Sequence, residues 1–188
     1  MTNAIRNACI EFCTDTLYWQ ERLDPITIAA IDMPYSIDTP SSANVAQVMS
    51  LTVDGAVVTP KSADWLDNNY LGWATATSDT PVFYYMPDPN NIVLVPAPTT
   101  TVDVVMRVAY TPTRDATVVP ITLHQYYLEG IAAGALMRLF GVPGQPWYSA
   151  ALVEHYGRAF SAAITNGVID ANKSYDRTGV RAQFRSRH

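Results

Sequence analysis

The spacing of apolar residues changes twice along the chain, and these changes predict where helices and strands lie. Residues 3–23 place apolar side chains at intervals of three and four, which is the spacing of one helix face. Asp24-Pro25 should end this helix, because the residue before a proline is pushed out of the helical region. The predicted apolar face consists of Ile5, Ala8, Cys9, Phe12, Thr16, Trp19 and Leu23.

Between residues 26 and 112 the pattern changes to short strands separated by turns, which favours a small antiparallel sandwich or barrel. The clearest strand is 102–110, where one face carries Val102, Val104, Met106, Val108 and Tyr110. In the strand 45–53, the residues expected on one face are Gln47, Met49, Leu51 and Val53. The remaining predicted strands are 26–28, 35–37, 56–58, 82–86 and 92–95.

Turn signals within this region fix how the strands connect. Asp54-Gly55 predicts a two-residue hairpin turn, because glycine accepts the positive φ that such a turn needs. Residues 88–91, which read Asp-Pro-Asn-Asn, predict a second hairpin. A short helix is predicted over residues 62–68, with Ser62 as its cap.

Helical spacing returns after residue 121. Thr122 is predicted to cap a helix that runs through Phe140 and ends at Gly141 and Pro143. A second helix is predicted over residues 149–169. Part of the first helix is lined by small residues, so another helix can approach it closely; these residues are Gly130, Ala133, Gly134 and Ala135.

The predicted fold class is therefore α+β. Residues 1–24 and 113–172 are expected to form a helical bundle, made of one N-terminal helix and a C-terminal helical hairpin. Residues 25–112 are expected to form a small antiparallel β subdomain inserted into that bundle. Residues 173–188 remain as a basic C-terminal arm.

Charge is distributed unevenly between the body and this arm. Residues 1–172 carry seven Arg or Lys against sixteen Asp or Glu, whereas residues 173–188 carry five against one. The acidic body argues against a sequence-reading DNA-binding protein, which needs a basic surface to neutralise phosphates. The arm suits a groove on another protein, although contact with DNA or simple solvation are alternatives. Its candidate docking residues are Lys173, Arg177, Val180, Arg181, Phe184, Arg185 and Arg187.

Candidate chemistry is sparse along the whole chain. Cys9 and Cys13 are four residues apart, a spacing that fits neither a disulfide framework nor a redox C-x-x-C motif. Both cysteines are expected to serve as small buried residues. His124 and His155 lie in no metal-binding or triad motif. The sequence contains neither of the phosphate-binding motifs G-x-x-x-x-G-K-[ST] and G-x-G-x-x-G. No catalytic residue, cofactor or metal is therefore predicted. No apolar run approaches the length of a membrane span, and synthesis in a reducing cytoplasm is expected.

Acidic pairs are the one feature that could serve an enzyme, because glycosidases need only two carboxylates. Glu11 and Asp15 share a predicted helix face, and Glu129 and Glu154 lie on the two late helices. With sixteen acids in the first 172 residues, such pairs are expected by chance. Solvated helix faces are the favoured interpretation.

The order of elements, together with several local motifs, resembles the head-to-tail adaptor proteins of tailed bacteriophages, especially short-tailed ones. The resemblance covers about residues 3–170. The motifs that carry it are Phe12, Thr16 and Trp19; Leu51-Thr-Val-Asp-Gly55 with Pro60; Thr80-Pro81 with Tyr84-Tyr85; Leu94-Val-Pro-Ala-Pro98; Arg114-Asp-Ala-Thr117 with Pro120 and Tyr126; Ile131-Ala-Ala-Gly-Ala-Leu136 with Arg138-Leu139; Pro146-Trp147; and Tyr156 with Phe160.

This resemblance implies a structural virion protein without catalytic residues. Such proteins form a ring, usually of twelve copies, beneath the portal and continue the DNA channel toward the tail or nozzle protein. DNA would pass through the ring without sequence-specific binding, and an acidic inner wall would keep its phosphates from sticking. By analogy with this family, the C-terminal arm would grip the portal.

Two other functions remain open from the sequence. One is a tail-associated cell-wall hydrolase, which would need a cleft with two facing carboxylates, one of them with a raised pKa. The other is a different virion ring component, such as a stopper or a tail-completion protein, which would differ in its neighbours.

Overall fold

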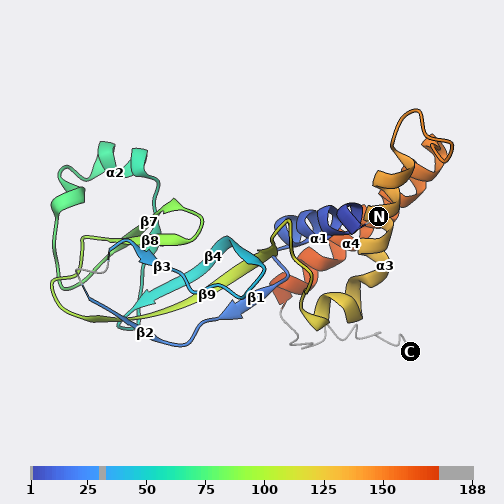
Figure 1. Ribbon diagram of the computed structural model, residues 1–188. Helices are drawn as coiled ribbons and strands as arrows, with labels where there is room; N and C mark the ends of the chain where they lie inside the picture. The colour runs from blue at the N-terminus through green and yellow to red at the C-terminus, as the bar shows by residue number, and fades with distance from the viewer. Residues whose placement is uncertain (1, 30–32, 174–188) are drawn as a thin grey trace, which may run out of the picture.

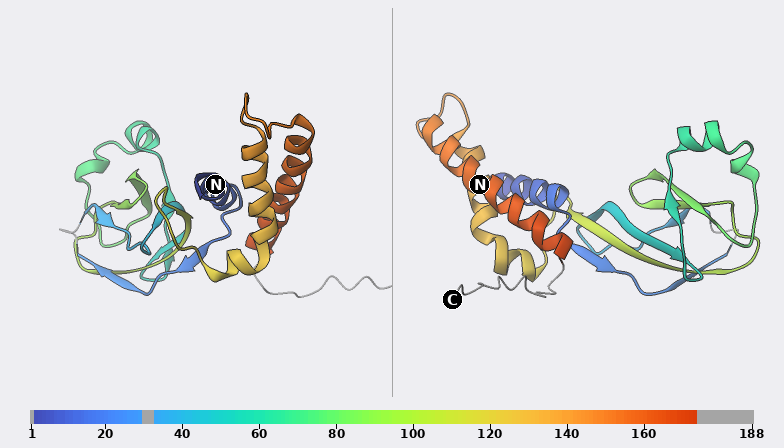
Figure 2. Two further views of the ribbon diagram at one scale, coloured as in Figure 1. Left: turned by 45° about the vertical axis from the view of Figure 1, so that its right-hand side comes forward. Right: turned by 180° about the vertical axis from the view of Figure 1, so that it is seen from behind.

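Two separate apolar cores, one between β-sheets and one among helices, give the molecule an elongated shape (Figure 1). The computed structural model describes residues 2–29 and 33–173. Figure 2 shows from two further sides that the sheets lie at one end and the long helices at the other. The predicted α+β class is confirmed.

The long helices lie near the start and the end of the chain, and two short ones lie in the middle. In the described residues they are α1 (Thr2–Thr16), α2 (Ala63–Asn69), a 3-10 helix η2 (Trp73–Thr75), α3 (Ile121–Phe140) and α4 (Ala150–Lys173). The strands are β1 (Gln20–Arg22), β2 (Ile26–Ile28), β3 (Tyr35–Ser36), β4 (Ala43–Val53), β5 (Ala56–Val57), β6 (Thr59–Pro60), β7 (Phe83–Asp88), β8 (Asn91–Val95) and β9 (Val102–Pro112).

The long strand β9 is the centre of the larger sheet. It pairs antiparallel with β4, β1 and β2, and β4 pairs in turn with β5. The predicted alternation of β9 is confirmed, because Val102, Val104, Met106, Val108 and Tyr110 are all buried. These side chains pack against residues of the smaller sheet, whose order is β3-β8-β7-β6, and together they form the sheet core.

The predicted face of β4 is confirmed at Leu51 and Val53 and wrong at Gln47 and Met49. The buried residues are Val45, Val48, Leu51 and Val53, whereas Gln47 is exposed and Met49 is half-buried. The register with β9 shifts twice, between Val45 and Gln47 and between Val48 and Ser50. Each β-bulge adds a residue and reverses which side the following residues face, so a strict alternation cannot describe this strand.

The turns are mostly as predicted. Val53 pairs with Ala56, and the two residues between them have the positive φ of a tight hairpin, 49° at Asp54 and 81° at Gly55. Asp88 pairs with Asn91, which confirms the second hairpin. The prediction that all strands are antiparallel is wrong at one place, because β6 runs parallel to β7.

The first helix is shorter than predicted: α1 ends at Thr16, not at residue 23. Leu17 has a positive φ of 51°, which no α-helix can continue. The chain then enters β1, where Trp19 packs on Tyr110 with 5.6 Å between ring centroids. Trp19 therefore belongs to the sheet core, and its helical spacing from Phe12 and Thr16 is coincidental.

Helix caps give one confirmation and one correction. Ser62 caps α2 as predicted, because its side-chain oxygen accepts a hydrogen bond from the Trp65 backbone N–H. Thr122 does not cap α3; it lies inside the helix, and Pro120 occupies the cap position. Proline fixes φ near the helical value, so it can begin a helix without a side-chain cap. Gly141 ends α3 as predicted.

The helix core forms where α1, α3 and α4 meet. Its buried residues are Ala8, Cys9, Phe12, Cys13, Leu123, Tyr127, Ile131, Ala133, Ala135 and Phe160. The predicted close approach on α3 is confirmed: a Cβ at Gly134 would lie 2.8 Å from the ring of Phe160, and one at Gly130 would overlap the Cβ of Ala163. On the other side of α4, a Cβ at Gly167 would lie 2.7 Å from Thr16 of α1.

We expect Gly130→Val to lower the free energy of unfolding by about 1–3 kcal/mol, because overpacking forces the two helix backbones apart. Ala132→Val is the matched control, since residue 132 is exposed on the same helix; its cost should stay near 0.5 kcal/mol, the helix-propensity difference. Urea denaturation measures both values. Equal losses for the two variants would contradict a close α3–α4 contact at Gly130.

A second prediction concerns alkaline pH. Burial, together with the charges of Glu21 and Asp38, raises the pKa of Tyr110 from 10 to about 12. The native state therefore holds this proton more tightly than the unfolded state, so the resulting stability is complete below pH 10 and is lost as the pH rises to 12. We expect Tm to fall across that range, and to fall less in Tyr110→Phe. An equally steep loss in the variant would assign the effect to other groups.

Candidate functional site

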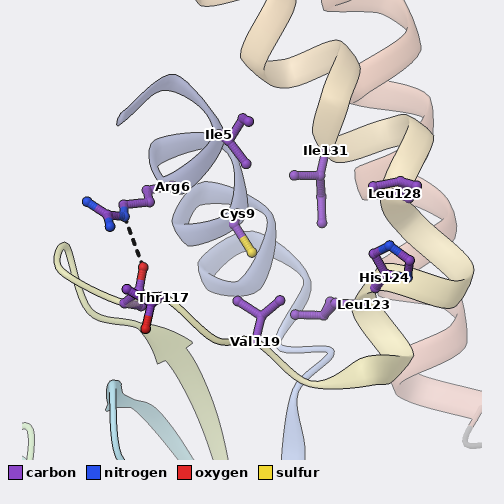
Figure 3. Close-up of a pocket in the computed structure, with 10 residues that line it drawn as sticks. Ile5, Arg6, Cys9, Thr117, Val119, Leu123, His124, Leu128 and Ile131 are labelled. Atoms are coloured by element: carbon purple, nitrogen blue, oxygen red, sulfur yellow. Dashed lines mark hydrogen bonds between the residues drawn. The ribbon is translucent and has the colours of Figure 1, made fainter. Parts of the chain in front are cut away.

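A cavity of about 400 Å³ opens between α1, α3 and the segment that joins β9 to α3 (Figure 3). We refer to it as the apolar groove. Its lining residues are Ile5, Arg6, Cys9, Ala116, Thr117, Val119, Leu123, His124, Leu128 and Ile131. Most of these side chains are hydrocarbon, which suits a binding surface more than a reaction centre.

The walls of the apolar groove come from three separate parts of the sequence. Figure 3 shows Ile5 and Cys9 on α1 facing Ile131 on α3, with Val119 and Leu123 below them. Arg6 ties the joining segment to α1, because its Nε donates a hydrogen bond to the Ala116 carbonyl at 2.9 Å. The groove is open at its rim, where Ile5 and Leu128 are 45% and 51% exposed.

The two cysteines are buried and free, which confirms that they serve as small core residues. The hydrogen bond with Cys9, together with burial, raises the pKa of Cys13. The same hydrogen bond lowers the pKa of Cys9, against an opposing effect of burial. Cys9 lines the groove. The lining residues include no Asp or Glu, and His124 is the one residue among them that could act as a base.

A second apolar surface lies at the opposite end of α3, in the loop that leads to α4. We call residues 141–148 the hairpin tip; every residue in it is exposed, and the loop projects beyond α1 in Figure 1. Its large apolar side chains are Val142, Trp147 and Tyr148. The Trp147 indole N–H donates to the Leu139 carbonyl at 3.2 Å, which fixes the ring against the end of α3.

Comparison with known proteins bears on what these surfaces serve. The model of the SU10 adaptor protein family matches residues 1–184, almost the whole chain. The chain belongs to the SU10 adaptor protein family. The match confirms the resemblance to bacteriophage adaptor proteins and supports a structural role in the virion. A search of curated proteins finds no match.

In this adaptor-family chain, the candidate carboxylates are engaged in ion pairs or lie in solvent. Glu11 pairs with Arg138 of α3, and Glu154 pairs with Arg158 one turn further along α4. Glu129 is exposed, as is His155. No group of three or more His, Cys, Asp or Glu gathers within residues 2–29 and 33–173. No helix in the same residues is long and apolar enough to cross a bilayer.

The predicted docking arm falls almost wholly outside the described part of the adaptor. Lys173 is described, and it is the exposed last residue of α4. The other candidates, which are Arg177, Val180, Arg181, Phe184, Arg185 and Arg187, lie beyond the described residues. The sequence predicted neither the hairpin tip nor the apolar groove as a binding surface, and the groove is built by three segments that lie far apart in the chain.

We expect the purified adaptor to release no soluble fragments from peptidoglycan, because Glu129 and Glu154 are exposed side chains on different helices and neither of them lines the apolar groove. A hydrolase would need one of two facing carboxylates to be desolvated so that its pKa rises. Turbidity loss of cell-wall suspensions measures the activity. Fragment release that disappears in Glu129→Gln or Glu154→Gln would contradict this prediction.

Proposed function

We propose that this protein forms an oligomeric ring between the portal and the tail of a bacteriophage and continues the channel through which DNA passes. The observation that carries the proposal is the adaptor-family match over residues 1–184. The family resemblance implies a ring of twelve copies, bound on one side to the portal and on the other to a tail or nozzle protein.

Exposed apolar surface supports a permanent assembly. Large apolar side chains cluster around the helical end of the molecule, both at the apolar groove and at the hairpin tip. Soluble monomers rarely expose contiguous apolar patches of this kind, whereas obligate interfaces are rich in them. The acidic body suits a channel wall, since like charge keeps the DNA backbone from adhering.

We also propose the predicted division into a helical bundle, residues 1–24 with 113–172, and a β subdomain at residues 25–112, with one change. Trp19 and β1 belong to the β subdomain, because Trp19 packs in the sheet core and β1 pairs with β9. Two observations favour this division. The sheet core and the helix core share no buried residue. The strands lie between α1 and α3 in the sequence, so the β subdomain can be regarded as an insertion.

The basic arm is the proposed docking element for the portal. It begins at Lys173, where α4 presents its exposed end. Arginine suits such a contact because its planar fork binds both oxygens of a carboxylate, and Val180 and Phe184 can supply apolar anchors between the arginines. Each desolvated Arg or aromatic anchor contributes on the order of 2 kcal/mol, and a ring repeats that contact in every copy.

We expect the triple variant Arg177→Glu, Arg181→Glu and Arg185→Glu to lose binding to isolated portals, as should deletion of residues 173–188. Electron microscopy of portal complexes measures ring occupancy. The matched control reverses three exposed arginines of the body, Arg22, Arg114 and Arg158, which gives the same change in net charge. Wild-type occupancy in the arm variant would show that the arm only solvates the chain.

A further inference from the structure

The helical end of this chain carries one concave and one convex apolar surface. The concave surface is the apolar groove beside the first half of α3, and the convex one is the hairpin tip just after α3. A chain cannot bring its own tip into its own groove, because the part of α3 that runs from Leu128 to Phe140 spans about 18 Å and holds the two surfaces apart. Any occupant of the groove must therefore be a different segment or a different molecule.

The chemistry of the tip matches that of the groove. No charged residue occurs between Arg138 and Glu154, so the tip is neutral as well as apolar. The groove offers hydrocarbon walls and one guanidinium cation, that of Arg6. Aromatic rings such as those of Trp147 and Tyr148 bind hydrocarbon with their bodies and cations with their faces.

The tip is also built to bind without losing much conformational freedom. Pro143 and Pro146 restrict its backbone, and the indole N–H of Trp147 is held by the Leu139 carbonyl. A loop whose shape is already restricted loses less entropy on association. Tryptophan, which is half exposed here at Trp147, is among the residue types that most often dominate an interface.

We propose that the hairpin tip of one copy docks into the apolar groove of the next copy, so that subunits join head to tail. This inference rests on the proposed ring and names the two surfaces that build it. A head-to-tail contact needs two different complementary surfaces on the same chain, and it closes into a ring when its rotation divides a full turn. In this arrangement the groove joins neighbouring subunits, while the arm binds the portal.

The test uses full-length protein with one surface altered at a time. Trp147→Ala removes the tip anchor, and Leu128→Glu places a charge at the groove rim; both side chains are about half exposed, so both variants should keep the wild-type melting temperature. Each variant alone should associate at least about tenfold more weakly in sedimentation experiments and form no rings on portals. Leu71→Ala, at a 98% exposed position near α2, is the matched control and should behave as wild type.

A mixture of the two variants distinguishes this contact from any other. The Leu128→Glu copy still has its tip, and the Trp147→Ala copy still has its groove, so the mixture should form one-to-one pairs that grow no further. Failure to pair, while wild type associates and both variants remain folded, would overturn the proposal. It would then follow that the tip or the groove binds another protein.

Cross-linking extends the test to rings assembled on portals, in case the free chain is monomeric. Because the free thiol of Cys9 lines the groove, this test uses a Cys9→Ala background. In that background the double variant Val142→Cys and Leu128→Cys, treated with a short thiol cross-linker, should give a ladder of covalent oligomers that neither single variant gives. Rings that form without this ladder, and that persist in Trp147→Ala, would overturn tip docking but leave the adaptor function intact. Absence of wild-type rings on portals would instead overturn the proposed function itself.

Discussion

The antiparallel pairing of β9 holds this molecule together, because that one strand connects both apolar cores. At one end it pairs with β2, β4 and β1, and it buries a continuous row of apolar side chains in the sheet core. At the other end the Thr111 hydroxyl donates to the Ile10 carbonyl of α1, at 3.4 Å, and residues 113–120 lead on to α3. Each fully buried valine or leucine in such a row contributes about 1.5–3 kcal/mol, so a break in this strand would affect both ends.

The division of apolar side chains between two small cores also explains the exposed surfaces. The helix core fills the space where three helices meet, but three helices cannot cover every apolar side of one another. The first half of α3 is covered on one side by α4 and only partly by α1, which leaves the apolar groove. The long α3–α4 hairpin likewise extends beyond α1 and leaves its tip without cover (Figure 2). Apolar surface that one chain leaves uncovered is available to the neighbouring copies of the proposed ring.

The sequence predicts a helix or strand of this structure well where the spacing of apolar residues stays constant from its first residue to its last. The face of β9 was predictable because all its even-numbered positions from Val102 to Tyr110 are buried, whereas two bulges in β4 make a single alternation fail. Trp19 was misassigned because helical spacing continued by coincidence past the positive φ of Leu17. The apolar groove was not predictable, since it depends on how Ile5, Val119 and Leu128 converge in space. The close contact of α3 with another helix was predictable from the small residues of α3, because side-chain size alone determines how closely two helices can approach.

Close packing of α3 on α4 has a consequence for assembly. In a head-to-tail ring, the angle between neighbours is set by the position of the tip relative to the groove, and any error is repeated at every contact. Both surfaces are attached to α3, so the rigidity of that helix determines the angle. Gly130 and Gly134 let α4 lie directly against α3, and the Tyr127 hydroxyl donates to Asp170 at 2.5 Å near the other end of the pair. A hairpin braced along its length in this way keeps tip and groove at a fixed separation, which is the condition for a ring to close.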